Sequence, residues 1–142
     1  MSDATIIKTV FFNASRETVW AFLTEKNKLG QWFHAAEADL AEGRDYTLIE
    51  TKEDGEAEKI CWGTVELMQP PSELVYTFTI KPLSGVITTV RWTLEEVHGG
   101  TKLTMRHEGI GTAGASALSL LTALDAGWDG HIGKLRTSVS EQ

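Results

Sequence analysis

The side chains that could do chemistry in this sequence are four histidines, a single cysteine and several glutamates on expected strands. His107 alternates with Leu103 and Met105, so a strand there turns all three side chains toward one face. An imidazole on an apolar face could orient a ligand or shuttle a proton. Alternatively, it is a buried histidine whose nitrogens bond a backbone group or a carboxylate. At the level of sequence, both interpretations of His107 stay open.

Two further histidines lie beside large aromatic residues. His34 directly follows Trp32 and Phe33, and we expect it near the mouth of any cavity. His131 comes three residues after Trp128, which puts it close to the same face of a helix. From there it could reach a cavity or lie at the boundary between helix and sheet.

The sequence has no pattern typical of a metal centre or an activated nucleophile. No two histidines have the His-x-x-x-His spacing, Cys61 has no Cys-x-x-Cys partner, and no Gly-x-Ser-x-Gly elbow occurs. Gly109, Gly111 and Gly114 match a Gly-x-Gly-x-x-Gly pattern, but that phosphate-binding loop requires a parallel βαβ unit, and the strand before it is expected to be antiparallel. We therefore expect no metal and no cofactor.

Acid–base catalysis would need a carboxylate that faces inward. On the strand expected over 57–68, Glu58 and Glu66 share a face with Trp62, whereas Cys61 and Val65 lie on the opposite face. An inward Trp62 would bring a polar residue with it and favour a ligand pocket. An outward Trp62 would need a partner surface. The sequence does not say which face is inward.

The elements that must position these side chains are separated by turn residues. Ser15 is a typical helix N-cap and predicts a helix through about Thr24, followed by a second short helix from about Lys26 to Phe33. From Ala36 onward the hydrophobic period changes to two, as in strands. The expected strands cover 5–13, 36–40, 44–52, 57–68, 73–80, 86–97 and 101–108, and a long helix covers about 113–139.

Apolar residues recur every three or four positions along the last helix, from Leu118 to Val139. This stripe predicts that the helix covers a large apolar surface. The same helix contains Gly127, Gly130 and Gly133, and each glycine destabilises a helix by about 1 kcal/mol relative to alanine. We interpret these glycines as sites of close packing, a kink or clearance for a ligand.

Together these elements predict an α+β fold. A curved antiparallel sheet of about six or seven strands wraps around the long C-terminal helix, and two short helices follow the first strand. We expect the concave side to hold an apolar and aromatic cavity. Alternatively, the rings simply fill the core, because burying each one contributes roughly 2–3 kcal/mol. The candidate cavity-lining residues are Trp32, Phe33, His34, Tyr76, Phe78, Trp92, Met105, His107, Trp128 and Ile132.

Length and composition fit one ordinary globular domain over residues 1–142. The net charge is −7, and no run of basic residues occurs, so binding to nucleic acid is not expected. No segment approaches the roughly 18 apolar residues of a membrane span. A single cysteine and an N-terminus without a signal-peptide pattern favour a cytoplasmic location.

The order of elements and several short motifs resemble the START-like (SRPBCC, helix-grip) superfamily. Within it, the chain is most similar to the branch related to the C-terminal domain of the activator of Hsp90 ATPase. The resemblance covers about 130 residues. The matching residues are Asn13-Ala14-Ser15, Val19-Trp20, Trp32-Phe33, Gly63, Thr101-Lys102-Leu103-Thr104, His107-Glu108-Gly109, and Gly127-Trp128 with Ile132 and Leu135.

The resemblance implies three hypotheses about function. The first is a domain that binds an apolar or aromatic small molecule in an internal cavity. The second is a co-chaperone or stress-related interaction module that works through its surface. The third is a cyclase- or hydrolase-like enzyme that uses His107 with an inward carboxylate. Under any of them the protein could be a monomer or a homodimer.

Overall fold

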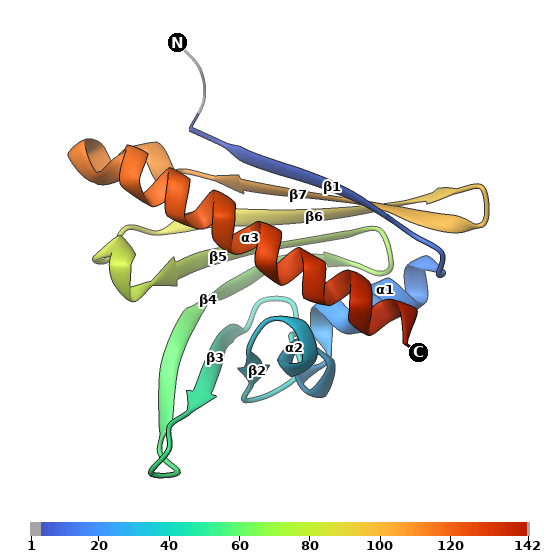
Figure 1. Cartoon of the computed structure of the whole chain (residues 1–142), viewed down its shortest axis with the longest axis horizontal. Coiled ribbons are helices and arrows are strands. Elements are labelled where there is room, and N and C mark those ends of the chain that lie inside the picture. The colour runs from blue at the N-terminus through green and yellow to red at the C-terminus, as the bar shows by residue number, and fades with distance from the viewer. Residues whose placement is uncertain (1–3, 142) are drawn as a thin grey trace.

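An antiparallel sheet curls into a half-barrel around one long helix in the computed structural model, which describes residues 4–141 (Figure 1). The strand order is β1-β7-β6-β5-β4-β3-β2, so the first and last strands of the chain pair with each other. The strands are β1 (Ile6–Phe12), β2 (Ala35–Ala36), β3 (Asp45–Thr51), β4 (Ala57–Gln69), β5 (Glu73–Ile80), β6 (Thr88–Val97) and β7 (Gly100–Glu108). The helices are α1 (Arg16–Thr24), α2 (Lys26–Trp32), η1 (Lys81–Leu83), η2 (Ile110–Ser116) and α3 (Ala117–Ser140). The predicted α+β fold is confirmed.

Helix α1 begins where the Ser15 cap predicts it, and α2 covers nearly the range expected for the second short helix. Ser15 has an extended backbone, and its hydroxyl accepts a hydrogen bond from the backbone N–H of Thr18 at 3.2 Å, which caps α1. The Trp32 indole N–H donates to the Phe22 carbonyl oxygen at 2.7 Å and ties the end of α2 to α1. These contacts fix the segment that follows α2, where Phe33 and His34 lie.

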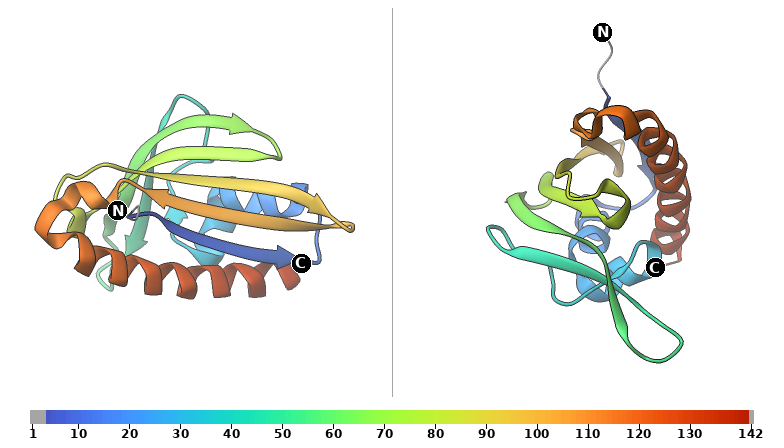
Figure 2. Two further views of the ribbon diagram at one scale, coloured as in Figure 1. Left: turned by 90° about the horizontal axis from the view of Figure 1, so that it is seen from above. Right: turned by 90° about the vertical axis from the view of Figure 1, so that its left-hand side faces the viewer.

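The central strands show the expected alternation. Val90, Trp92 and Leu94 on β6 are buried, and so are Leu103 and Met105 on β7. The register pairs Trp92 with Met105 and Leu94 with Leu103. This concave face carries the core, and α3 lies across it (Figure 2).

Strand β4 departs from simple alternation at two points. Leu48 pairs with Cys61 and Ile49 with Lys59, so Ile60 is an extra residue in β4. A second shift between Val65 and Leu67 leaves another unpaired residue in the pairing with β5. Each bulge reverses which alternate residues face the core. The middle of β4 therefore turns Cys61 and Val65 inward, whereas at its start Glu58 lies at the inner side.

Trp62 lies on the outer, convex side of β4. It is only partly buried, and the Lys59 ammonium lies 4.3 Å from the centre of its ring. This cation–π contact with Lys59 covers part of the indole within the chain itself. The sequence left open which face of β4 is inward. Because the bulges reverse the alternation, neither face of β4 is inward along its whole length.

The long helix packs unevenly. From its midpoint onward it buries Trp128, Ile132, Leu135 and Val139, as the apolar stripe predicts. The expectation for Leu118 is wrong, because that side chain is 73% exposed. The physical reason is that the first turns of α3 project beyond the strand ends (Figure 2). Within residues 4–141, no helix combines the length and hydropathy that a membrane crossing requires.

Candidate functional site

A cleft of about 310 Å³ opens between the middle of α3 and the β4–β5 side of the sheet. It is a surface cleft rather than a closed internal cavity, since the space behind it is filled by side chains such as Trp32 and Trp92, each 1% exposed. Most of its wall is apolar. It is lined by Phe33, His34, Glu58, Lys59, Ile60, Cys61, Phe78, Ile80, Lys81, Pro82, Ala123, Leu124, Gly127, Trp128 and His131.

One face of α3 forms one wall. Leu124 and His131 are each three or four residues from both Gly127 and Trp128, so the four lie on the same side of the helix. Gly127 contributes open space, because a Cβ atom added there would have nothing within 4 Å. Gly130 and Gly133 are exposed and equally free of neighbours, so neither is a site of close packing. The helix continues unbroken from Ala117 to Ser140.

The opposite wall comes from β4, β5 and η1. The bulge at Ile60 brings Glu58, Ile60 and Cys61 to the cleft together. Without the bulge, strict alternation would turn Cys61 to the face opposite Glu58 and Ile60. Pro82 of η1 closes the wall at the end of β5.

Aromatic rings form the inner end of the cleft. The Phe33 ring lies 5.4 Å from the Trp128 ring and 4.7 Å from the His131 ring, between centroids. Phe78 lies 5.9 Å from Trp128. These separations are typical of packed aromatic pairs, which hold one another in fixed orientations.

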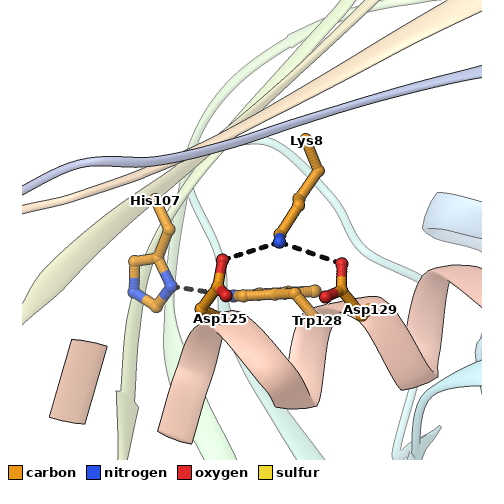
Figure 3. Close-up of polar contacts among 5 residues, drawn as sticks. All are labelled: Lys8, His107, Asp125, Trp128 and Asp129. Atoms are coloured by element: carbon orange, nitrogen blue, oxygen red, sulfur yellow. Dashed lines mark hydrogen bonds and ion pairs between the residues drawn. The ribbon is translucent and has the colours of Figure 1, made fainter. Parts of the chain in front are cut away.

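His107 lies behind this aromatic wall and is fully buried. The Trp128 indole N–H donates to His107 Nδ1 at 3.0 Å, a contact that links α3 to the sheet (Figure 3). Because an indole nitrogen can only donate, Nδ1 carries no proton, and the proton of the neutral ring is on Nε2. His107 Nε2 then donates to Thr88 Oγ1 at 2.7 Å, and the Thr88 hydroxyl donates to the Phe78 carbonyl at 2.7 Å.

This chain of hydrogen bonds uses both nitrogens of His107. Desolvation by burial lowers the pKa of the imidazole to about 4, so the ring is neutral at pH 7. No lone pair of His107 is left for a substrate, and its partners are Thr88 and Trp128 rather than a carboxylate. The geometry therefore matches a structural role and gives no support to acid–base chemistry at His107.

The two histidines at the cleft have a different environment. His34 and His131 are half-buried, with ring centroids 5.5 Å apart. Desolvation lowers the pKa of both; the charge of Lys134 lowers each further, whereas Glu50 raises that of His34. For Cys61, burial raises the pKa of the thiol to about 12, so this side chain is a neutral, unreactive thiol.

The structure brings four of the ten predicted lining residues to the cleft and keeps six out of it. Phe33, His34, Phe78 and Trp128 line it. The other six are buried in the core, and the polar atoms of the four aromatic ones have partners there; for example, the Trp92 indole N–H donates to the Tyr76 hydroxyl at 2.9 Å. The residues that do not line the cleft are Trp32, Tyr76, Trp92, Met105, His107 and Ile132.

Several lining residues were absent from the predicted set. Leu124 and His131 could have been included from their helical spacing relative to Trp128, and Gly127 from its spacing relative to those two residues. The β4 residues Glu58 and Ile60 could not, because their position depends on the bulge. In the described part of the chain, no three His, Cys, Asp or Glu side chains gather in a way that could hold a metal ion.

Comparisons with solved structures find the same fold. CalU16 from Micromonospora echinospora has a TM-score of 0.77 at 22% identity, with 96% of this chain and 76% of that chain covered. Protein MLL2253 from Mesorhizobium loti has a TM-score of 0.79 at 20% identity, with 97% and 98% covered. DynU16, a protein in the dynemicin biosynthetic locus, has a TM-score of 0.79 at 24% identity. That match covers 98% of this chain but only 48% of DynU16, so this chain spans about half of its length.

At the level of sequence, no curated protein matches the chain. The family model described as "Activator of Hsp90 ATPase homolog 1-like protein" matches residues 13–140. This match covers nearly the whole chain and agrees with the helix-grip fold described above. The chain therefore belongs to the activator of Hsp90 ATPase homolog 1-like family, within the START-like superfamily.

Proposed function

We propose that the chain binds small apolar or aromatic molecules in the cleft beneath the middle of α3. The observation that carries this proposal is the uneven burial of the helix. Four buried side chains, Trp128, Ile132, Leu135 and Val139, anchor α3 from its midpoint to its C-terminus, whereas Leu124, which lines the cleft, is only partly buried. A ligand in the cleft would remove Leu124 and the rest of the apolar wall from water, which is favourable.

The size of the cleft supports a small ligand. Its volume of about 310 Å³ is at the lower end of the range of roughly 300–1,000 Å³ that is typical of small-molecule sites. The packed rings of Phe33 and Trp128 offer flat surfaces for an aromatic body. The lining also includes three charged side chains that keep the entrance of the cleft hydrated, namely Glu58, Lys59 and Lys81.

The test uses anilinonaphthalene sulfonate, a dye whose fluorescence rises in apolar sites, and two variants of α3. Gly127→Leu adds a side chain into the cleft at a position where no atom lies within 4 Å of the new Cβ. Gly130→Leu adds the same side chain to the same helix outside the cleft. We expect Gly127→Leu to weaken dye binding at least tenfold and Gly130→Leu to bind like the wild type.

Both variants should fold, because leucine is a better helix former than glycine. Equal dye affinity in the wild type and in Gly127→Leu would contradict the proposal, since the dye would then bind elsewhere. Native mass spectrometry of the freshly purified protein provides an independent readout, in which a co-purifying apolar molecule is expected and should be lost in Gly127→Leu.

A second candidate function is a protein-interaction role of the kind that the family's name describes. Strand β1 is at the edge of the sheet and exposes Ile7 and Phe11, which are 52% and 59% accessible. Exposed apolar side chains of this size on an edge strand are suited to a protein partner. The double variant Ile7→Lys, Phe11→Lys should abolish capture of an Hsp90-type chaperone if β1 is the contact, and should leave dye binding in the cleft unchanged.

A further inference from the structure

His34 and His131 form a pair of imidazoles at the wall of the cleft. His34 follows α2 and His131 is on α3, and both rings pack against Phe33, at 4.8 and 4.7 Å between centroids. The remaining polar side chains of the wall are charged or, at Cys61, a buried thiol. The pair therefore supplies the neutral hydrogen-bonding groups of this wall.

The tautomer of His131 follows from its one backbone contact. Its Nδ1 lies 3.4 Å from the Trp32 carbonyl oxygen. Because a carbonyl oxygen can only accept, Nδ1 must carry the proton in this contact. In the neutral ring, Nε2 then has a lone pair and acts as an acceptor.

The surroundings keep both rings neutral. Desolvation lowers the pKa of each, and their closeness adds to this effect because a charge on His34 disfavours a charge on His131. Glu50 acts in the opposite direction on the pKa of His34, and the hydrogen bond to the Trp32 carbonyl does so on that of His131, but the net shift of both pKa values is downward. Lys134 disfavours protonation of both rings. The charged side chains around the pair are Glu50 on β3, Glu58 and Lys59 on β4, Lys81 on η1 and Lys134 on α3.

We propose that His34 and His131 select aromatic ligands that carry a hydrogen-bond donor, such as phenols. The hydroxyl donates to an imidazole nitrogen while the aromatic body lies against Phe33 and Trp128. An apolar ligand without a donor would leave these acceptors covered and unpaired, which is unfavourable. This inference rests on the proposed function, because it concerns the ligand of the same cleft.

The experiment compares naphthol with methoxynaphthalene by isothermal titration calorimetry at neutral pH, where naphthol is uncharged. The two molecules share an aromatic body, but only naphthol can donate a hydrogen bond. We expect the wild type to bind naphthol about tenfold more tightly, the factor that one net hydrogen bond supplies. The double variant His34→Phe, His131→Phe keeps two rings at these positions and should lose this preference while still binding methoxynaphthalene.

His98→Asn is the matched control, since His98 lies in the β6–β7 turn, has a φ of 51°, and asparagine tolerates this left-handed conformation. It should keep the full preference for naphthol. NMR of ¹⁵N-labelled histidine in the wild type gives a readout that needs no variant, because naphthol should shift an Nε2 resonance of the pair and methoxynaphthalene should not.

Equal affinity of the wild type for both molecules would overturn the selectivity for donors and leave the proposed function standing. Failure of both naphthalenes to bind a protein that still binds the dye through Gly127 would also overturn the phenol proposal alone. If dye binding fails the Gly127 test as well, the proposed function and this inference fall together.

Discussion

The imidazole of His107 shows how one buried polar residue can join two layers of a fold. It accepts from the Trp128 indole on α3 and donates to Thr88 on the sheet, so each of its nitrogens is satisfied only in one tautomer of the neutral ring. Protonation of Nδ1 would place its hydrogen against the hydrogen of the Trp128 indole N–H, so that two donors would face each other and the hydrogen bond would be lost. His107 therefore locks α3 to the sheet while it is neutral.

The stability of the protein should depend on this neutral state. The pKa of His107 is about 4 in the folded chain and about 6.5 in the unfolded chain, so between these values only the unfolded chain takes up the proton. The stabilisation is fully present above pH 6.5 and is lost as the pH falls toward 4, by roughly 3 kcal/mol in total. Urea denaturation at pH 7 and pH 4 measures this loss.

The comparison variant for this titration is His107→Gln, which cannot be protonated. It should be less stable than the wild type at pH 7 but should lose about 3 kcal/mol less on acidification. Because His34 and His131 titrate in both proteins, the difference between the two slopes isolates His107. If the free energy of unfolding depended on pH equally in the wild type and in His107→Gln, neutral His107 would not be what stabilises the contact between α3 and the sheet.

A second prediction concerns Gly63, where β4 passes close to β5. A Cβ atom added to Gly63 would lie 2.1 Å from the Thr77 carbonyl oxygen, the same oxygen that accepts from the Tyr46 hydroxyl at 2.7 Å. Gly63→Ala should therefore lower the free energy of unfolding by roughly 3 kcal/mol, through displaced backbone and a broken hydrogen bond. Thermal denaturation and the near-UV circular dichroism of the aromatic core measure the effect, and an unchanged melting temperature would argue against the contact.

Among the helices, α3 is anchored from Trp128 onward and lies over the cleft between Ala123 and His131. The anchored part also contains two exposed glycines, Gly130 and Gly133, where an added Cβ would have nothing within 4 Å. Burial of Trp128, Ile132 and Leu135 supplies the stability that the glycines lack. The helix thus depends on tertiary packing rather than on its own propensity.

Replacing these two glycines should stabilise the protein. Gly130→Ala and Gly133→Ala should each raise the free energy of unfolding by about 1 kcal/mol, because alanine is the better helix former and its Cβ has free space at both sites. Urea denaturation of the single and double variants tests this, with additive effects expected. A decrease in stability would mean that these positions need the freedom of glycine.

At the scale of the whole molecule, the sheet edge at β1 is tied to the helix by charge. Lys8 Nζ lies 2.6 Å from Asp125 Oδ1 and 2.9 Å from Asp129 Oδ1, one turn further along α3 (Figure 3). Burial opposes the charge of Lys8, but the hydrogen bonds and charges of the two aspartates outweigh it and raise its pKa. This bridge holds the first strand against the helix that covers the concave face.

Removing the bridge should have a small, salt-dependent effect. Lys8→Met keeps the apolar stem and removes the charge, and we expect a loss of about 0.5–1 kcal/mol at low salt, because both aspartates are more than half exposed. The loss should shrink in 0.5 M salt. Lys102→Met on β7 serves as the control for removing a lysine elsewhere, and a salt-independent loss in Lys8→Met would point to packing instead of charge.

The sequence by itself determined the order of the elements and the choice of core faces in regular strands. Turn residues, the Ser15 cap and the spacing of Val90, Trp92 and Leu94 act through neighbours within a few residues, so they can be interpreted without a partner. The tertiary structure decided which residues form the cleft. The bulge at Ile60 arises only when β4 pairs with β3, and it reverses the alternation from which an inward face would be inferred.

The tryptophans follow the same division. Their apolar character places them inside, but whether an indole ring fills the core or faces the cleft depends on which polar partner its N–H can reach. The Trp92 indole N–H donates to the Tyr76 hydroxyl, and its ring lies in the core. The Trp128 N–H donates to His107, and part of its ring lines the cleft. These partners come from strands and helices far apart in the sequence, so only the folded chain could pair them.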